Sequence, residues 1–385
     1  MTKRLPVISK LAIALILGSV SFSGCALKVM KSDKAAEMLR SKEYEQAMTV
    51  KDIPVDETST TGTYVGLPGP VPVAPSSEVP TLAAPVKTIS KASSRGAAKA
   101  AKTSANKIDV AALPLTPSGA AAAAVAKMVG TSAKHEPSME DGRSFFGRRP
   151  IKDPFHVGEK VTLEVSYFSV VAGDMTVETR GFSEVNGRKS YHFAGTAMST
   201  SVFAMFYAIE DSFETYVDFE TLVPVSYALH VKESKQLREV RTLFDWLAHK
   251  ARYFDKKIND EQKLEEKNEI WDLPAYAQNV FSAAYYLRTF DLKPGLKTQF
   301  SVAHEGKNLI ATAEVLRRER ISTAAGDFNT VVVKPTISLD GKFTPMGDVF
   351  IWLTDDDRKF IVRIESKIKI GKVVGVAKAI ELGKQ

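Results

Sequence analysis

The sequence predicts a mainly β (α+β) protein, with one globular domain preceded by a long disordered tether. Segments of alternating apolar and polar residues recur from residue 151 onward, with the period of half-buried strands. Only one stretch of that part, about 272–290, has the apolar spacing of a helix. About a dozen closely spaced strands favour a curved, largely antiparallel sheet. Because open sheet edges are a liability, we expect it to form a barrel or half-barrel.

Charge supports this division. Residues 1–150 carry 20 Lys and Arg against 12 Asp and Glu, a net charge of +8. Residues 151–385 carry 32 against 33, a net charge of −1. A nucleic-acid-binding domain concentrates positive charge on its folded surface, so the near-neutral domain argues against nucleic acid as a partner.

Residues 1–24 have the pattern of a secretion signal peptide. Basic residues near the N-terminus precede an apolar run, Leu11 to Val20, that is shorter than the roughly 20 residues of a spanning helix. Small residues then lead into Cys25, the only cysteine of the chain, in a pattern that resembles a bacterial lipobox. The resemblance implies that Cys25 becomes the mature N-terminus and carries acyl chains such as palmitate. The alternative is an ordinary signal peptide with a cysteine in its cleavage region.

The residue after Cys25 is Ala26 rather than Asp. By similarity to lipoprotein sorting in Gram-negative bacteria, this favours the outer membrane, facing the periplasm. The predicted location is therefore the cell envelope, with the membrane bound through the N-terminal lipid anchor.

Residues 25–150 read as a lipid-anchored, disordered tether rich in Pro, Ala and Lys. A short helix is expected within 32–50, with Ser32 or Asp33 as its N-cap. Seven prolines between Pro54 and Pro85 favour extended conformations over a packed core. No acid lies between Glu78 and Asp109, so this part is either a basic arm for anionic lipid or cell wall, or a solvated spacer.

The domain of residues 151–385 opens with a strand pair, Phe155 to Arg180, whose pattern breaks at 172–174. Asn186-Gly187 predicts a tight hairpin, because both residues tolerate positive φ. The charge run at 259–269 suggests a solvated loop or hairpin end. Asp272 is the expected N-cap of the main helix. Further strands are expected at 297–304, 309–318, 328–335, 348–353, 360–368 and 373–382.

Several of these segments together are similar to a bacterial envelope family, the domain of unknown function 3108. They are the FHVGEKVTLEV start at Phe155, Val171-Ala-Gly, SFETYVD at Ser212, AAYYLR at Ala283 and VFIWLTDD at Val349. The resemblance covers about residues 150–382. It implies no catalytic residue, because the family carries no established activity. Its curved sheet with one helix is similar to periplasmic lipoprotein carriers, which hold acyl chains in an apolar concavity.

The residues show no signature of catalysis or of a cofactor. The six histidines are scattered without metal-site spacing, and no nucleophile elbow, Walker A or dinucleotide motif occurs. Glu210 and Glu214 share one strand face while Asp211 lies on the other, so they form no acid/base pair. We therefore expect no enzyme, no metal and no cofactor.

Four side chains are candidates for binding an apolar ligand: Tyr207, Tyr285, Arg288 and Trp352. The aromatic ones fit a cavity lining or plain core packing. Arg288, on an apolar helix face, either orients a ligand headgroup or pairs with a buried carboxylate. Two functions remain open. One is a non-catalytic binding module for a lipid, an apolar ligand or a segment of an envelope protein. The other is a structural lipoprotein of envelope assembly.

Overall fold

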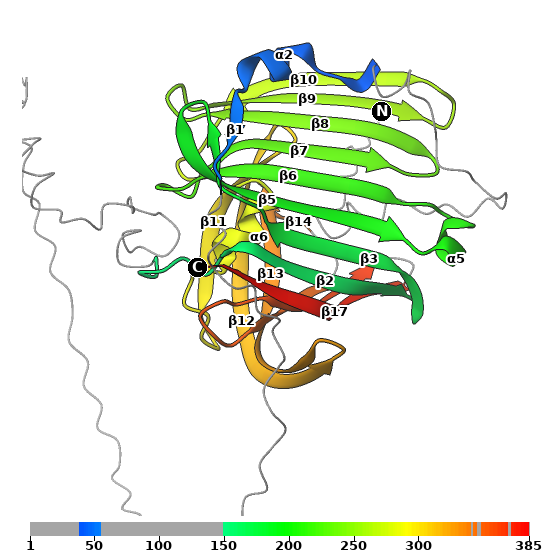
Figure 1. The fold of residues 1–385 in the computed structure, drawn as a ribbon, viewed down its shortest axis with the longest axis vertical. Helices are drawn as coiled ribbons and strands as arrows, with labels where there is room; N and C mark the ends of the chain where they lie inside the picture. Colours follow the sequence, from blue (N-terminus) through cyan, green and yellow to red (C-terminus); the bar gives the residue numbers. More distant parts are fainter. Residues whose placement is uncertain (1–37, 55–148, 340–341, 345–347, 369–370, 385) are drawn as a thin grey trace, which may run out of the picture. The chain divides into compact units, whose positions relative to one another are not determined.

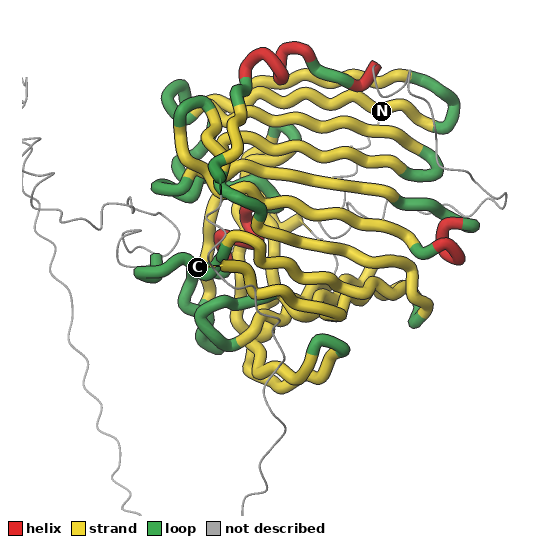
Figure 2. The backbone as a smooth tube through the Cα atoms, in the orientation of Figure 1, coloured by secondary structure: helices red, strands yellow, loops and turns green. Residues whose placement is uncertain are grey.

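The computed structural model describes residues 38–54, 149–339, 342–344, 348–368 and 371–384, which form one large β-sheet with three short helices (Figures 1 and 2). The helices are α2 (Lys42–Ala47), α5 (Ser201–Ala204) and α6 (Ser282–Leu287). The strands of the first half are β1 (Val50–Asp52), β2 (Val157–Tyr167), β3 (Val170–Thr179), β4 (Ser183–Val185), β5 (Arg188–Ser199), β6 (Glu210–Asp218), β7 (Pro224–Lys232), β8 (Gln236–Asp245) and β9 (Lys250–Asn259). Those of the second half are β10 (Leu264–Asp272), β11 (Lys297–His304), β12 (Lys307–Thr323), β13 (Gly326–Leu339), β14 (Lys342–Thr344), β15 (Asp348–Thr354), β16 (Ile361–Ile368) and β17 (Gly371–Lys384).

The sheet is antiparallel throughout its ladders. Pairing runs in the order β10, β9, β8, β7, β6, β5, β3, β2, β17, β16, β15, β13, β12, β11. The short strands add at the sides: β4 beside β5, β1 beside β4, and β14 beside β13. The sheet curves, so that β11 to β13 run steeply across the direction of β5 to β10 (Figure 1). The predicted curved antiparallel sheet is confirmed.

The curved sheet is not closed by a ladder between its last strands, β10 and β11, among the described residues. Asn308 at the start of β12, which pairs with the end of β11, is bonded to β10 instead. The indole Nε1 of Trp271 donates to Asn308 Oδ1 at 3.0 Å, and Asn308 Nδ2 donates to the carbonyl of Asp272 at 2.8 Å. Of the two predicted forms, the half-barrel is the one observed. The charge run expected as a loop belongs in part to β10, whose exposed Glu and Lys side chains suit an edge strand.

The opening hairpin turns earlier than its pattern indicated. Phe168 and Ser169 have positive φ values of 49° and 64° and form the turn between β2 and β3. The break at 172–174 instead marks a close approach, because a Cβ on Gly173 would lie 2.1 Å from the carbonyl oxygen of Met198 in β5. The hairpin predicted at Asn186-Gly187 is confirmed, with φ values of 50° and 80° between β4 and β5.

The predicted helix at about 272–290 is present but is only six residues long, as α6. Asp272 is not its N-cap, because β10 continues through Asp272. Between them, Gln278 forms an isolated bridge to β11: Gln278 N donates to Ser301 O at 2.9 Å, and Ala303 N to Gln278 O at 2.8 Å. The carboxamide oxygen of Asn279 accepts from the amides of Phe281 and Ser282 and so starts the helix.

The core fills the inner face of the sheet around α6. Phe281 stacks on Phe213 of β6, and Tyr285 on Phe193 of β5, each at 3.7 Å between ring centroids. On the other side, Tyr286 meets Phe300 of β11 edge to face at 5.5 Å. The helix thereby joins the two halves of the curved sheet, as expected of a helix on the concave face.

Candidate functional site

The outer face of β6 to β10 holds a segment from far away in the sequence, residues 38–54, which we call the strap. Its blue ribbon crosses the upper strands from right to left and then descends as β1 (Figure 1). Its first apolar contact is Leu39, which is buried against Leu237, Ile258 and Leu264. The strap was assigned to the disordered tether from its sequence, so the structure moves it into the domain.

Tyr44 of α2 is the main side chain that the strap buries. It is 6% exposed, and the guanidinium of Arg241 lies 5.3 Å from its ring centroid. Burial raises the pKa of Tyr44 to about 12. Helix α2 is capped by Ser41, whose hydroxyl accepts from the Tyr44 amide at 3.4 Å. Ser32 and Asp33, the expected N-caps of a helix within 32–50, lie outside the described residues. An aromatic ring under a cation on the sheet is a specific docking contact.

Asn186 holds the strap by its backbone. Its carboxamide oxygen accepts from Thr49 N at 2.9 Å, its Nδ2 donates to Ala47 O at 3.3 Å, and its own amide donates to Thr49 O at 3.0 Å. The side chain of a tight turn therefore also clasps a segment 137 residues away.

Strand β1 completes the docking by pairing antiparallel with β4, Val50 opposite Val185 and Asp52 opposite Ser183. Lys51 lies 3.5 Å from Glu184 across this pair. The chain leaves the sheet just afterwards, where Ile53 N donates to Phe182 O at 2.9 Å. This is strand addition combined with buried side chains, a common mode of peptide recognition.

The chain returns to the sheet close to where it leaves. Arg149 is buried, donates to Asp153 Oδ1 at 2.6 Å and donates to the carbonyl of Glu220 at 2.9 Å. Phe219, beside Glu220, meets the Phe182 ring at 5.5 Å. Residues 55–148 thus connect two neighbouring points of one sheet.

Arg288 forms the densest ionic cluster of the interior. Its Nη1 lies 2.6 Å from Glu159 Oε1, and the second carboxylate oxygen accepts from Arg358 at 2.6 Å. Burial alone would raise the pKa of Glu159, but Arg288 and then Arg358 lower it below its usual value. Pairing with a buried carboxylate, one of the two interpretations of Arg288, is therefore observed.

Tyr285 adjoins this cluster. Its ring lies 5.5 Å from the Arg288 guanidinium, and its hydroxyl donates to the carbonyl of Glu178 at 3.0 Å. The Tyr285 hydroxyl and the Arg288 guanidinium both have hydrogen-bond partners within the protein, which is the arrangement of a packed core.

Tyr207 lies elsewhere, in a small cluster with Ala197 and Ile209. Its hydroxyl donates to Glu233 Oε2 at 2.6 Å, and Gln236 Nε2 donates to the same oxygen at 2.6 Å. Asp211 is buried nearby, and burial, followed by the charge of Glu233, raises the pKa of Asp211 to about 8. Asp211 and Glu233 each keep one buried oxygen without a hydrogen-bond partner.

The expected separation of the three strand carboxylates is confirmed. Asp211 is buried, while Glu210 pairs with Lys232 and Glu214 lies 3.1 Å from His192.

Trp352 is buried in the main core, where its indole Nε1 donates to Glu319 and Arg363 lies 5.3 Å from its ring. Of the four candidate ligand side chains, the structure therefore brings together Tyr285 and Arg288. Tyr207 belongs to a different cluster.

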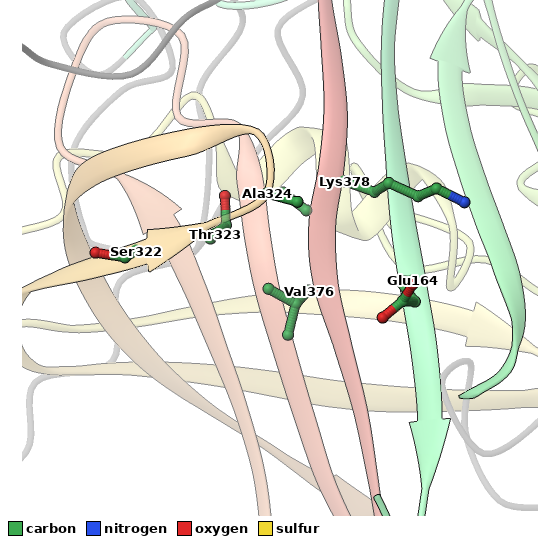
Figure 3. Close-up of a pocket in the computed structure, with 7 residues that line it drawn as sticks. Glu164, Ser322, Thr323, Ala324, Val376 and Lys378 are labelled. Carbon is green, nitrogen blue, oxygen red and sulfur yellow. The ribbon is translucent and has the colours of Figure 1, made fainter. Parts of the chain in front are cut away.

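One hollow of about 450 Å³ is found beside the β12–β13 hairpin (Figure 3). Ser322, Thr323 and Ala324 of the hairpin face Val376 of β17 and Glu164 of β2 across it. Lys378 extends away over β2 and pairs with Asp174 of β3 at 3.0 Å. The volume of the hollow falls in the range of ligand sites. Most of its lining is small side chains, and Lys378, its one cation, is paired with Asp174, so the geometry of the hollow specifies no chemistry.

The described residues contain no group of three His, Cys, Asp or Glu side chains placed to hold a metal ion. No described helix has the length and apolar character needed to cross a bilayer. Cys25, the predicted lipid attachment site, lies outside the described residues, as do the signal peptide and most of the predicted tether.

Sequence reasoning missed the strap because its signal is weak. Leu39 and Tyr44 are isolated apolar residues, and their positions match no helix stripe. Asn186 was recognised for its turn, which is a local property, while its hold on Thr49 depends on contacts far apart in the sequence.

Solved structures show a limited likeness to this chain. They are a β-barrel-like protein of domain of unknown function DUF1849 from Brucella abortus (TM-score 0.40, 10% identity, 59% of this chain and 98% of that one) and a candidate lipoprotein from Parabacteroides distasonis (0.24, 10%, 60% and 100%). A third is a candidate exported protein with a YmcC-like fold from Bacteroides fragilis (0.24, 11%, 59% and 97%).

No protein with a curated description matches the chain significantly. The sequence model of one family, described as protein of unknown function (DUF3108), matches residues 162–378, from β2 to β17. The match covers more than half of the chain and agrees with the resemblance drawn from its motifs. The chain therefore belongs to the DUF3108 family.

Proposed function

We propose that this protein is a cell-envelope lipoprotein of the outer membrane whose β domain is a non-catalytic module for binding extended protein segments. The observation that carries the proposal is the strap, bound by the β1–β4 ladder, by Asn186 and by the buried side chains Leu39 and Tyr44. The sheet holds its own N-terminal segment in the way that segment-binding domains hold a partner.

The filled inner face of the sheet argues for a protein segment, rather than a lipid, as the ligand of the domain. The core around α6 fills that face with stacked aromatic side chains such as Phe281 and Tyr285. The candidate ligand residues Tyr285 and Arg288 have their polar groups bonded to Glu178 and Glu159. The outer face already shows the recognition elements in use.

The strap also fixes the domain near its anchor. Met38 lies thirteen positions after Cys25 in the sequence. An extended chain of that length spans at most about 45 Å. On this proposal the domain stays next to the membrane in which Cys25 is anchored.

Releasing the strap tests segment binding. In a Leu39→Ser/Tyr44→Ala chain, a fluorescent peptide of residues 36–56 should bind in trans, and anisotropy should rise with protein concentration. The intact chain should bind the peptide at least about tenfold more weakly, because its own strap occupies the face. A peptide with Tyr44→Ala is the matched control. If the released chain binds neither peptide, the segment-binding function is wrong.

A second function, scaffolding in envelope assembly, is favoured by the two ends of residues 55–148. Both ends are fixed on neighbouring points of the sheet, at Ile53 and Arg149, so a partner bound between them would be held against the domain. Pull-downs from envelopes with the full chain and with a chain lacking 55–148 distinguish the functions. Partners kept by both proteins would argue against scaffolding through this segment.

A further inference from the structure

The end of the sheet near α5 exposes an apolar surface that we call the rim. Its members are Phe168, Val170, Val171, Met198, Val202, Met205 and Phe206. They are seven of the thirteen large hydrophobic side chains exposed among the described residues. The other six lie outside residues 168–171 and 198–206, the two segments that form the rim, and single exposed apolar side chains of that kind are common on protein surfaces.

Two adjacent turns build the rim. Residues 168–171 span the β2–β3 turn and the start of β3, and residues 198–206 span the end of β5 and α5. Thr200 N donates to Ala172 O at 2.8 Å, and Gly173 pairs with Ser199, so the two segments lie side by side at the right of Figure 1. Neither segment carries a charge: residues 165–173 and 193–209 contain no Asp, Glu, Lys or Arg.

The α5 segment is held so that its apolar side faces out. Phe203 packs against the cluster of Tyr207 and Ile209, and Tyr207 is tied to Glu233. Val202, Met205 and Phe206, spaced i, i+3 and i+4, point the other way, and Phe206 is 64% exposed. The inward contacts are satisfied, so the outward residues are not needed for folding the turn.

The strap begins at this same end. Leu39 packs on Leu237, Ile258 and Leu264, next to the β7–β8 and β9–β10 turns. The β7–β8 turn is bonded to the α5 segment, since Ser234 N donates to Ala208 O at 3.1 Å. From there the strap runs toward the opposite end, where β1 pairs with β4. The first described residues of the strap, Met38 and Leu39, therefore lie on the side of the rim.

We propose that the rim docks on the surface of the lipid bilayer that carries the anchor, with Phe168, Val202, Met205 and Phe206 inserted at the headgroup boundary. This inference rests on the proposed lipid anchor at Cys25. Apolar side chains on uncharged, protruding turns suit a fluid surface, which needs no matching groove. A second weak contact with the same membrane also stabilises an anchor of acyl chains and orients the domain.

A fluorophore at the rim tests this in the full-length protein reconstituted in vesicles of phosphatidylethanolamine and phosphatidylglycerol. An acylated Cys25 has no free thiol, so a cysteine introduced by Met205→Cys takes the environment-sensitive label alone. Leu247→Cys is the matched control, because Leu247 is 98% exposed on the β8–β9 turn at the other end of the sheet. We expect a blue-shifted emission and protection from an aqueous quencher at position 205 and neither at 247. Val202→Cys repeats the test if the first variant folds poorly.

The outcomes separate this inference from the proposed anchor. Equal emission and quenching at 205 and 247 in acylated protein would overturn the rim and leave the anchor standing. Cys25 found without acyl chains by mass spectrometry removes the anchor. In that case the label at position 205 is measured in a Cys25→Ser chain. A blue shift of its emission when vesicles are added supports membrane docking of the rim without the anchor. Phe168→Ser/Phe206→Ser should reduce vesicle binding of that unacylated chain at least about tenfold, since each buried ring is a large part of the contact.

Discussion

Arg288 holds together the buried ionic cluster that it forms with Glu159 and Arg358. It reaches Glu159 through two nitrogen atoms and also donates to the carbonyls of Pro154 and Arg358. Both Arg288 and Glu159 are almost fully buried. The pair joins α6 to β2 at a sequence separation of 129 residues, so it closes the fold over a long loop.

Replacing Arg288 by Met should lower the free energy of unfolding by about 3 kcal/mol, because a buried carboxylate loses a partner. Arg180→Met is the matched control, since Arg180 pairs with Glu178 on an exposed surface and should cost less than about 1 kcal/mol. Urea unfolding of the two purified variants measures both values. Equal losses would show that Glu159 does not depend on Arg288.

Asp211 predicts a pH dependence of opposite sign to that of a paired carboxylate. Burial and then Glu233 raise its pKa from 3.8 to about 8. A raised pKa means that the folded state keeps the proton longer than the unfolded state. The stability it contributes is present below pH 4 and is lost as the pH rises to about 8, at up to about 1.4 kcal/mol per pH unit.

Asp211→Asn should remove most of this loss, because Asn keeps the acceptor for the Lys232 amide and does not ionise. The measurement is the melting temperature of the wild type minus that of the variant, followed between pH 5 and 8. Taking this difference cancels the contribution of His156, which both proteins share. The pKa of His156 is lowered to about 4 by burial and then Arg358, so its effect on stability has the reverse sign. An unchanged difference across that range would mean that Asp211 is ionised in the folded protein.

At the scale of elements, the long strands follow directly from alternation, while the short elements do not. β12, β13 and β17 alternate over many residues and were all predicted. The helix was predicted too long because Val280, Phe281, Ala284 and Tyr285 have helical spacing. Residues 273–281 are instead not helical, and Gln278 forms an isolated bridge to β11 through Ser301 and Ala303. Such a contact leaves no local signal in the sequence.

Gly173 stands at a position of the β3–β5 ladder that accepts only glycine. A Cβ at residue 173 would lie 2.1 Å from Met198 O and 2.9 Å from Ser199 Cα, so the two strands would have to separate. Gly173→Ala should therefore cost several kcal/mol, or about 15 °C in melting temperature, as overpacking of a backbone contact. The matched control is Gly375→Ala in β17, where the nearest atom would be at 3.7 Å. Similar melting temperatures for both variants would contradict the close approach.

At the scale of the whole molecule, the fold class and the family were readable from sequence, and the placement of the strap was not. Strand periodicity gives the sheet, and the ordered motifs between Phe155 and Val349 give the family. Nothing in the spacing of Leu39 and Tyr44 identifies the face they cover. Arg288 was recognised as a candidate for ion pairing, but Glu159 as its partner follows only from the topology.

The domain should fold without residues 55–148. Ile53 and Arg149 are bonded to Phe182 and to the segment of Phe219, whose rings are 5.5 Å apart, so a short Gly-Ser linker can replace the removed part. We expect a melting temperature within a few degrees of the full chain, because loop length contributes weakly to stability. Differential scanning calorimetry measures it, with a chain lacking 38–148 as the control that should be less stable. A large loss from the first deletion would show that 55–148 supports the domain.

Under mechanical load the strap acts as a latch: while it is docked, the residues after it add nothing to the distance between the domain and Cys25. On the proposed lipid anchor at Cys25, a pull on the domain would reach Leu39 first and then Tyr44, and would peel β1 from β4 last. While the latch holds, the domain stays within about 45 Å of the anchor. Once it opens, the next fixed residue is Arg149, 124 positions after Cys25, and the reach grows to roughly 400 Å. The same chain can thus hold the domain close to the anchor or let it move far away. The contacts of seventeen residues, 38–54, decide which of the two distances applies.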